Sequence, residues 1–390
     1  MSGVTDRAIA VIGGGIGGLT AALALARHGA SVTVYEQAPA LREVGAGLQI
    51  TPNGARVLNA LGLDDALRDV GVTAHAVQPM NALTGRAIAQ FDLRGQVPRY
   101  RFYHRADLLD VLAAGCRDAG VTLKLNAKIT DVSADGGFKC AAETVNPDLT
   151  IGADGLHSVV RPVINPPEQP FFTGQTAWRC VVPCADVPPV AQIWMAPGRH
   201  VVTYPMRNNV LNIVAVQEQA AWAAEGWHHA DDPANLRAAF DDVAPPLRDI
   251  LTNVAAVNQW GLFRHPVAAR WYNGRLAILG DAAHPTLPFL AQGANMAIED
   301  AYVLARALMD NPRQGDALQA YQAARAPRVT RAIAAANANA RNYHLAGVQA
   351  AVAHTGLRVL GKVAPHAFLS RLSWLYAHDV TWPSYQLAAV

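Results

Sequence analysis

The pattern of apolar and polar residues near the N-terminus predicts two strands joined by a helix. An apolar run extends from Ala8 to Gly14, residues Gly15 to His28 have helical spacing, and Ser31 to Glu36 return to strand character. A strand, a helix and a second strand in this order predict a βαβ unit. We expect it to begin a doubly wound α/β fold.

Three later segments have the pattern expected of the same parallel sheet. Arg105 to Gly120 are spaced as a helix and precede a strand-like run from Val121 to Leu125. Further buried strands are predicted at Leu149–Ile151 and at Arg275–Leu279. A helix is expected from about Asn295, and the chain after it reads as mostly helical.

The middle of the chain has a different pattern. Short β runs follow one another closely and predict an antiparallel sheet with one face free to cover a cofactor. These runs are Thr176 to Val182, Ala191 to Ala196, His200 to Pro205 and Val210 to Val216. The more polar stretch from Gln219 to Asp242 is expected to form a helix-turn-helix excursion on the surface.

A chain of 390 residues exceeds the size at which a single core stops growing, so two domains are expected. We predict a discontinuous Rossmann-like cofactor domain, an inserted β-sheet substrate domain and a C-terminal helical segment. The cofactor domain comprises residues 1–71, 98–165 and 270–345, the substrate domain 72–97 and 166–269, and the helical segment 346–390.

Composition excludes several classes of function. Apolar residues make up 51% of the chain, charged residues 16%, and the net charge is +2, which argues against disorder and a nucleic-acid surface. The apolar runs are too interrupted for a membrane span, and a cytoplasmic location is expected. The four cysteines lack zinc-site spacing, and His228-His229 is interpreted as a solvated loop, so no metal site is predicted.

A glycine motif opens the first helix. Gly13, Gly15 and Gly18 form Gly-x-Gly-x-x-Gly between strand and helix, and Glu36 ends the next strand. The glycines allow a tight turn, the approach of a pyrophosphate and close helix packing, while the carboxylate suits a ribose. The motif predicts dinucleotide binding, but it does not by itself distinguish NAD from FAD.

Two further motifs point to a flavin. Gly152-Ala153-Asp154-Gly155 and Gly280-Asp281 each follow a predicted strand. With the glycine motif, they resemble the single-component FAD-dependent aromatic hydroxylases, or class A flavoprotein monooxygenases. The segments from Arg42 to Ile50 and from His104 to Leu109 resemble the branch of salicylate hydroxylase, 3-hydroxybenzoate 6-hydroxylase and 6-hydroxynicotinate 3-monooxygenase. Thr51 departs from the glycine that is usual in that branch.

This resemblance implies the cofactors and the reaction. FAD would be bound, NADH or NADPH would bind transiently, and O2 would form a flavin C4a-hydroperoxide that hydroxylates a phenolic or hydroxy-N-heteroaromatic ring. The residues predicted to contact the cofactor are Gly13, Gly15, Ile16, Gly18, Glu36, Gln37, Arg42, Gly47, Leu48, Arg105, Asp154, Gly280, Asp281, Pro288, Gly293, Ala294 and Asn295.

The predicted catalytic residues are His200, Tyr204 and Gln292. His200 and Tyr204 share one strand face with Val202, and a neutral imidazole can accept a phenol proton near neutral pH. The resemblance implies that both line the substrate pocket with Gln292. Additional pocket residues are expected to be Gln49, Val202, Pro288 and Phe289. The structural alternative is a half-exposed histidine and a core tyrosine.

Other functions remain open at the level of sequence. A flavin oxidoreductase or epoxidase of the same fold could act on an isoprenoid or quinone precursor. A flavin module that senses redox state without turnover is a further alternative. The sequence predicts a small aromatic substrate, with or without a carboxylate. It identifies neither the ring nor the nicotinamide, and it leaves monomer and homodimer open.

Overall fold

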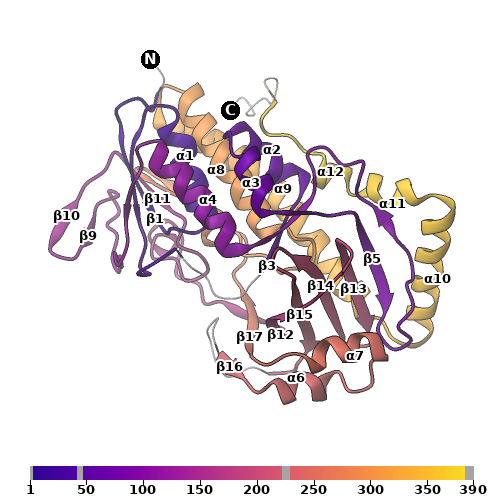
Figure 1. The fold of residues 1–390 in the computed structure, drawn as a ribbon. Coiled ribbons are helices and arrows are strands. Elements are labelled where there is room, and N and C mark those ends of the chain that lie inside the picture. The colour runs from indigo at the N-terminus through magenta and orange to yellow at the C-terminus, as the bar shows by residue number, and fades with distance from the viewer. Residues whose placement is uncertain (1–2, 42–46, 222–228, 383–390) are drawn as a thin grey trace.

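The fold was examined in a computed structural model that describes residues 3–41, 47–221 and 229–382 (Figure 1). Among these residues, two large sheets lie side by side with helices around them. Arg42 and His228, both named above, lie outside the described residues.

The first sheet holds the N-terminal βαβ unit. Its six described strands occur in the order β18-β19-β11-β1-β2-β8, parallel except for β18. They are β1 (Ala8–Ile12), β2 (Ser31–Tyr35), β8 (Thr122–Lys124), β11 (Leu149–Gly152), β18 (Tyr272–Asn273) and β19 (Leu276–Ile278). The parallel strands expected from their apolar runs are therefore confirmed.

Helices cover this sheet because their apolar faces pack against it and against one another (Figure 1). The helices in this part of the chain are α1 (Ile16–Ala26), α2 (Pro52–Ala60), α3 (Asp64–Val70), α4 (Arg105–Asp118), α5 (Arg161–Ile164), α8 (Gly293–Asp310) and α9 (Gln314–Tyr343). Helix α8 begins at Gly293, two residues before the predicted start.

The second sheet contains the middle of the chain. Its eight described strands occur in the order β16-β17-β12-β15-β14-β13-β5-β6. They are β5 (Ala76–Asn81), β6 (Phe91–Asp92), β12 (Phe171–Pro183), β13 (Val190–Ala196), β14 (Arg199–Met206), β15 (Val210–Glu218), β16 (His229–Asp231) and β17 (Val257–Arg264). The sheet is mixed rather than antiparallel throughout, because β5 pairs with β13 in parallel.

The excursion expected between Gln219 and Asp242 is different in the structure. Strand β16 joins the sheet edge, and one helix, α6 (Pro233–Ala239), follows it in the described part of that range. Leu236 and Phe240 are buried, together with residues of α7 (Pro245–Thr252), against the eight-stranded sheet. These apolar residues pack into the core of the eight-stranded sheet. The segment therefore covers the sheet instead of forming an excursion on the surface.

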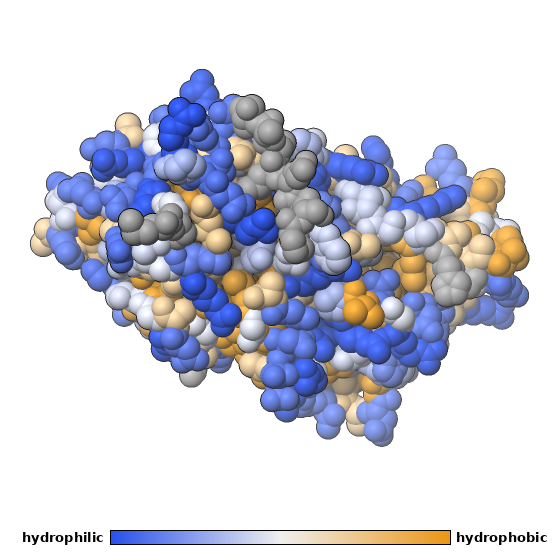
Figure 2. Space-filling model, turned by 90° about the horizontal axis from the view of Figure 1, so that it is seen from above, coloured by the Kyte–Doolittle hydropathy of each residue, from blue (hydrophilic) through white to orange (hydrophobic). Residues whose placement is uncertain are grey.

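Smaller elements complete the fold. Strands β3 (Gly47–Ile50), β4 (Val72–Thr73) and β7 (Arg101–His104) form a small antiparallel sheet, and β9 (Phe138–Cys140) pairs with β10 (Glu143–Val145). After α9 come α10 (Gly347–Val363), α11 (Pro365–Arg371) and α12 (Ser373–Tyr376). Figure 2 shows apolar side chains at the α10 end of the molecule, where Val348, Val352, Val359 and Val363 are exposed.

Candidate functional site

The glycine motif lies at the carboxyl edge of the parallel sheet. Gly13 has a φ of +108°, and a Cβ added at Gly18 would lie 2.0 Å from the Gly13 carbonyl oxygen. A Cβ at Gly15 would have no neighbouring atom within 4 Å. Gly13 and Gly18 are therefore fixed by the turn and by packing, whereas Gly15 borders open space.

The first turn of α1 is suited to an anion. Gly15 caps the helix without a side-chain hydrogen bond, and no acidic residue occupies the first turn. The first N–H groups of a helix have no partner within the helix and carry its positive dipole end. Ile16 in this turn is buried, and the Glu36 carboxylate accepts hydrogen bonds from Gly14 N at 2.6 Å and Ala38 N at 2.8 Å.

Two aspartates meet this edge from neighbouring strands. Asp154 follows β11 and Asp281 follows β19, and these strands are parallel neighbours. Asp154 Oδ2 accepts a hydrogen bond from Val159 N at 2.8 Å, but its buried Oδ1 has no partner among the described residues. Burial raises the pKa of Asp154, and hydrogen bonds from Ser158 and the backbone act in the opposite direction. Asp281 is exposed.

The remaining predicted cofactor residues differ in their burial and contacts. Gly47 N donates to Asn212 Oδ1 at 2.7 Å, and Gly280 has a φ of +58° in the 3-10 turn η1 (Gly280–Ala282). Leu48, Arg105 and Pro288 are partly buried, and Gln37 is exposed. Gly293 and Ala294 form the first turn of α8, which also lacks an acidic residue.

Asn295 joins the glycine-rich turn to β3. Its Nδ2 donates to Ala291 O at 2.6 Å and to Gln49 O at 3.0 Å, and its Oδ1 accepts from Thr51 N at 3.1 Å. The side-chain amide is thus engaged by the protein. Any contribution of this turn to a ligand would come from the N–H groups at the start of α8.

These features fit a dinucleotide. Open space at Gly15 and the uncapped start of α1 suit a pyrophosphate, and the exposed Asp281 suits sugar hydroxyls. The buried Asp154 Oδ1 has no hydrogen-bond partner among the described residues, so a donor on a ligand would satisfy it.

A second group of residues extends from β14. His200 is 1% exposed, and its ring centroid lies 5.4 Å from Phe289 and 5.2 Å from Tyr343. His200 Nδ1 is 2.7 Å from His344 Nε2. Burial, followed by the neighbouring His344, lowers the pKa of His200 well below its usual value. His200 is therefore a neutral base at neutral pH.

Tyr204 lies farther along the same strand face, in contact with β3 and β7. Its ring centroid is 5.0 Å from that of Phe102, and burial raises its pKa, against the effect of its hydrogen bond with Gln49. Gln49 Oε1 also accepts from the Tyr100 hydroxyl at 2.5 Å. Val202, between His200 and Tyr204, is partly buried and packs against residues on both sides.

Gln292 is near this group but has protein partners of its own. Its Oε1 accepts from Asn53 Nδ2 at 3.1 Å, and its Nε2 donates to Thr51 Oγ1 at 3.1 Å and to Leu290 O at 3.3 Å. Among the described residues it makes no hydrogen bond to His200 or Tyr204. Thr51, which replaces the glycine that is usual in the related branch, therefore helps to hold Gln292 in place.

His344 and Glu218 were not among the residues selected from the sequence. His344 caps the end of α9, and its Nδ1 lies 2.8 Å from Glu218 Oε1 at the end of β15. No sequence spacing connects positions 200, 218 and 344. The only sequence signal was the single histidine after a long Ala-rich helix.

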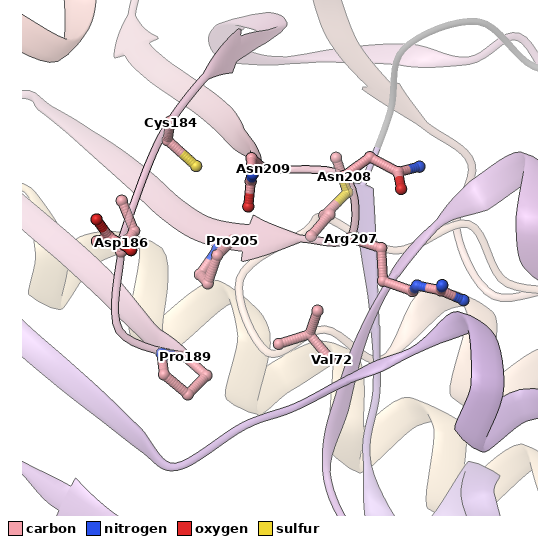
Figure 3. A pocket seen from close by; sticks show the side chains of 10 residues that line it. Val72, Cys184, Asp186, Pro189, Pro205, Arg207, Asn208 and Asn209 are labelled. Atoms are coloured by element: carbon pink, nitrogen blue, oxygen red, sulfur yellow. The ribbon is translucent and has the colours of Figure 1, made fainter.

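A separate pocket opens beside the turn between β14 and β15 (Figure 3). It has a volume of about 360 Å³, and Val72, Cys184, Pro205 and Arg207 contribute to its lining. Pro205 points away from the face that carries Tyr204, because side chains alternate along a strand. None of the predicted catalytic residues lines this pocket.

The described residues also show neither a metal cluster nor a membrane-spanning helix. Within ranges 3–41, 47–221 and 229–382, no three His, Cys, Asp or Glu side chains come together as a possible metal site. None of the helices in the described part of the chain is both long and apolar enough to cross a membrane.

Comparison with known proteins identifies the class. The family described as "FAD binding domain" matches residues 6–336, and the chain belongs to this family. FAD is therefore the bound cofactor of this chain. The relatives below place the chain among the FAD-dependent monooxygenases of the aromatic hydroxylase type.

Two relatives and one solved structure are similar to this chain over most of their length. The chain is 36% identical to 3-amino-4-hydroxybenzoate 2-monooxygenase of Streptomyces cremeus, over 87% of this chain and 88% of the relative. It is 33% identical to 3-hydroxybenzoate 6-hydroxylase 1 of Aquipseudomonas alcaligenes, over 95% of this chain and 98% of the relative. The crystal structure of a Klebsiella pneumoniae HpxO variant complexed with FAD is 25% identical, with a TM-score of 0.81 over 94% and 98%.

Proposed function

We propose that this FAD-dependent monooxygenase hydroxylates a phenolic aromatic acid, with a hydroxybenzoate favoured over a hydroxy-N-heteroaromatic ring. The observation that carries the proposal is the buried His200, whose Nδ1 lies 2.7 Å from His344 Nε2, and we assign its Nε2 to the substrate. The named activities of the relatives support the substrate class. When bound, FAD would carry electrons from NAD(P)H to O2, and O2 would be the source of the oxygen atom that reaches the ring.

His200 accepts the phenol proton at Nε2. Because burial lowers the pKa of His200, the ring is unprotonated at neutral pH and ready to act as a base. Removing the phenol proton raises the electron density of the ring, which suits attack by an electrophilic oxygen. Because His200 is buried, the attraction between the phenolate and the protonated imidazole is stronger than it would be in water.

Apolar side chains exclude water from the proposed ring position. Phe289 and Leu290 are 4% and 6% exposed, and the Tyr343 hydroxyl donates to Phe289 O at 3.3 Å. The Tyr376 hydroxyl donates to Leu290 O at 3.4 Å. The two tyrosines hold the loop that would close one side of the pocket. A dry site limits unproductive loss of the reactive oxygen.

The other selected residues orient the substrate or the loop. Gln49 contacts the Tyr100 hydroxyl and bonds Tyr204, so this pair would present a polar edge to the ring. Gln292 would act by fixing the 288–292 loop through Asn53 and Thr51. Pro288, Phe289 and Val202 would supply the apolar surface of the pocket.

Cofactor contacts follow from the geometry at the sheet edge. The N–H groups of α1 would bind the pyrophosphate, Glu36 a ribose and Asp281 the ribityl hydroxyls. Arg105 and the Asp154 region would contact the same ligand. Leu48 with Gly47 would flank the ring system, and the start of α8 would face its carbonyl edge.

A substrate screen tests the proposal. Purified holoenzyme is mixed with hydroxybenzoates, aminohydroxybenzoates and hydroxynicotinates, and NADH and NADPH oxidation is recorded together with product mass. We expect at least one phenolic acid to stimulate oxidation and gain one oxygen atom. Oxidation with no oxygen in the product would favour a dehydrogenase, and inertness toward both nicotinamides would favour a redox-sensing module.

The role of His200 predicts a specific loss. His200→Ala should retain FAD and slow hydroxylation about 100-fold, the order expected for removal of a general base. The exposed His75→Ala is the matched control and should behave as wild type. Because the pKa of His200 is lowered, the wild-type rate should remain high through pH 6.5 and decline only below it. Equal rates for His200→Ala and wild type at neutral pH would remove the proposed role.

We also propose that the enzyme acts in the cytoplasm as a monomer or homodimer. The four cysteines are free in the described structure, which suits a reducing compartment. Light scattering of the holoenzyme at several concentrations would identify the oligomeric state, and a mass beyond two chains would contradict the proposal.

A further inference from the structure

Three side chains form an unbroken row from the buried His200 to solvent. His200 Nδ1 is 2.7 Å from His344 Nε2, and His344 Nδ1 is 2.8 Å from Glu218 Oε1. Both separations are those of normal or short hydrogen bonds. The three residues come from β14, from the end of α9 and from the end of β15.

Burial decreases along the row. His200 is 1% exposed, the side chain of His344 is 2% exposed and that of Glu218 is 56% exposed. The row therefore begins inside the protein and ends in water. His200 alone has no such outlet, because Phe289 and Tyr343 pack against the rest of its ring.

The carboxylate determines the direction of the hydrogen bonds. An ionised carboxylate only accepts, so His344 Nδ1 carries the proton that Glu218 receives. The neutral His344 then accepts at Nε2, and His200 donates from Nδ1. His200 Nε2 is left with a lone pair, which is the form required of a base.

Main-chain hydrogen bonds hold the three segments in register. Gly198 N donates to His344 O at 3.1 Å, and Glu218 N donates to Gly198 O at 2.9 Å. Gly198 has a φ of +67° at the turn before β14. The row is thus supported by backbone contacts that do not depend on the side chains that compose it.

Among the groups packed around the row, the carboxylate of Glu218 is bonded directly to His344. Burial lowers the pKa of His344, and the hydrogen bond and charge of Glu218 raise it. Burial raises the pKa of Tyr343, so this neighbour of His200 stays neutral. Arg199, next in sequence to His200, pairs instead with Asp242. Glu218 is therefore the charged group that faces the pair of imidazoles.

We propose that His344 and Glu218 transfer the substrate proton between His200 and water. The proposal rests on the proposed function, in which His200 deprotonates a phenol. Neither residue touches the substrate, so both act through His200.

Each transfer balances. The phenol O–H bond breaks as His200 Nε2–H forms, and the His200 Nδ1–H proton passes to His344 Nε2. The His344 Nδ1–H proton passes to Glu218 Oε1, from which water removes it. The reverse sequence returns a proton to the hydroxylated product and restores both tautomers. No group is oxidised or reduced, and no reactant other than water is needed.

The first experiment measures proton transfer directly. Holoenzyme is mixed with 3-hydroxybenzoate in a stopped-flow instrument, and phenolate formation is followed by ultraviolet absorbance. Glu218→Gln should slow phenolate formation about tenfold, because an amide accepts a hydrogen bond but not a proton. Glu143→Gln removes another exposed carboxylate, on β10, and is the matched control. Flavin absorbance shows that each variant is folded and loaded.

The outcomes separate the two proposals. If wild type forms phenolate and Glu218→Gln forms it equally fast, the relay is wrong and the proposed function stands. If the full panel of phenolic acids is neither bound nor hydroxylated by wild type, the proposed function fails.

A second measurement needs no substrate. Nitrogen-15 spectra of histidine-labelled holoenzyme report which ring nitrogen carries each proton, and His344→Gln assigns the signals. We expect His344 to be protonated on Nδ1, and His200 also on Nδ1. A proton on His344 Nε2 in the wild type would overturn the relay, whatever the ligand. Loss of this pattern in Glu218→Gln, but not in Glu143→Gln, would support it.

Discussion

At the scale of single residues, the glycine motif separates packing from binding. Gly18 has the Gly13 carbonyl oxygen where a Cβ would lie, 2.0 Å away, and Gly15 has nothing within 4 Å of that point. Both residues belong to the same short motif, but only one of them is required by the protein's own atoms. We propose that FAD occupies the space beside Gly15.

This difference predicts opposite effects of the same substitution. Gly18→Ala should lower the thermal midpoint of the apoprotein, because the new methyl group displaces backbone. Gly15→Ala should leave the apoprotein midpoint unchanged and weaken FAD binding about tenfold. Differential scanning fluorimetry and FAD titration check the two effects. Equal losses of stability in both variants would contradict the distinction.

At the scale of elements, the C-terminal segment is tied to α8 and α9 through buried charges. Burial alone would raise the pKa of Glu299 on α8, but Arg325 and Arg328 of α9 hold it at about 2. Arg328 also donates to the carbonyl oxygens of Trp374 and Leu375, both at 2.8 Å. Arg328 therefore anchors the segment that carries Tyr376. The hydroxyl of Tyr376 in turn donates to Leu290 O.

Removal of the arginine should loosen the segment. Arg328→Leu should reduce the free energy of unfolding by about 3 kcal/mol, as expected for breaking a buried charge pair. Arg68→Leu, which removes an exposed ion pair on α3, is the control and should cost less than about 1 kcal/mol. Urea denaturation of the two variants measures the difference. Similar midpoints would show that the buried pairs do not anchor the segment.

Local sequence patterns predicted the parallel strands and the positions of the two motifs that follow β11 and β19. Those features depend on short-range periodicity and on glycine geometry. The parallel pairing of β5 with β13 was not predicted, because it joins segments that are more than 100 positions apart. The same reason hid His344 and Glu218, whose meeting with His200 depends on how α9 packs. The roles of His200, Tyr204 and Gln292 remain predictions.

At the scale of the whole molecule, the proposed cofactor site is assembled from distant parts of the chain. The glycine motif, Asp154 and the segment from Gly280 to Asn295 reach one sheet edge through the parallel order β19-β11-β1. A ligand that bridges these parts binds the folded chain and not the unfolded one. It therefore stabilises the fold as a unit.

Cofactor removal should have a correspondingly large effect. At an FAD concentration 100 times its dissociation constant, we expect about 2.7 kcal/mol of added stability. The thermal midpoint of apoprotein should rise with FAD and not with equal NADH, since the nicotinamide binds only transiently. Asp281→Ala should weaken this dependence. A midpoint that is insensitive to FAD would contradict the assembly of the site from these segments.

The hydrogen bonds of Gly198 have a consequence for engineering. They join a turn of the eight-stranded sheet to the end of a helix that is 144 positions away from His200. A chimera that exchanges only the sheet with that of a relative would bring a new histidine face to a foreign helix end. To transplant substrate preference, the donor segment must include both the sheet and the last turn of α9.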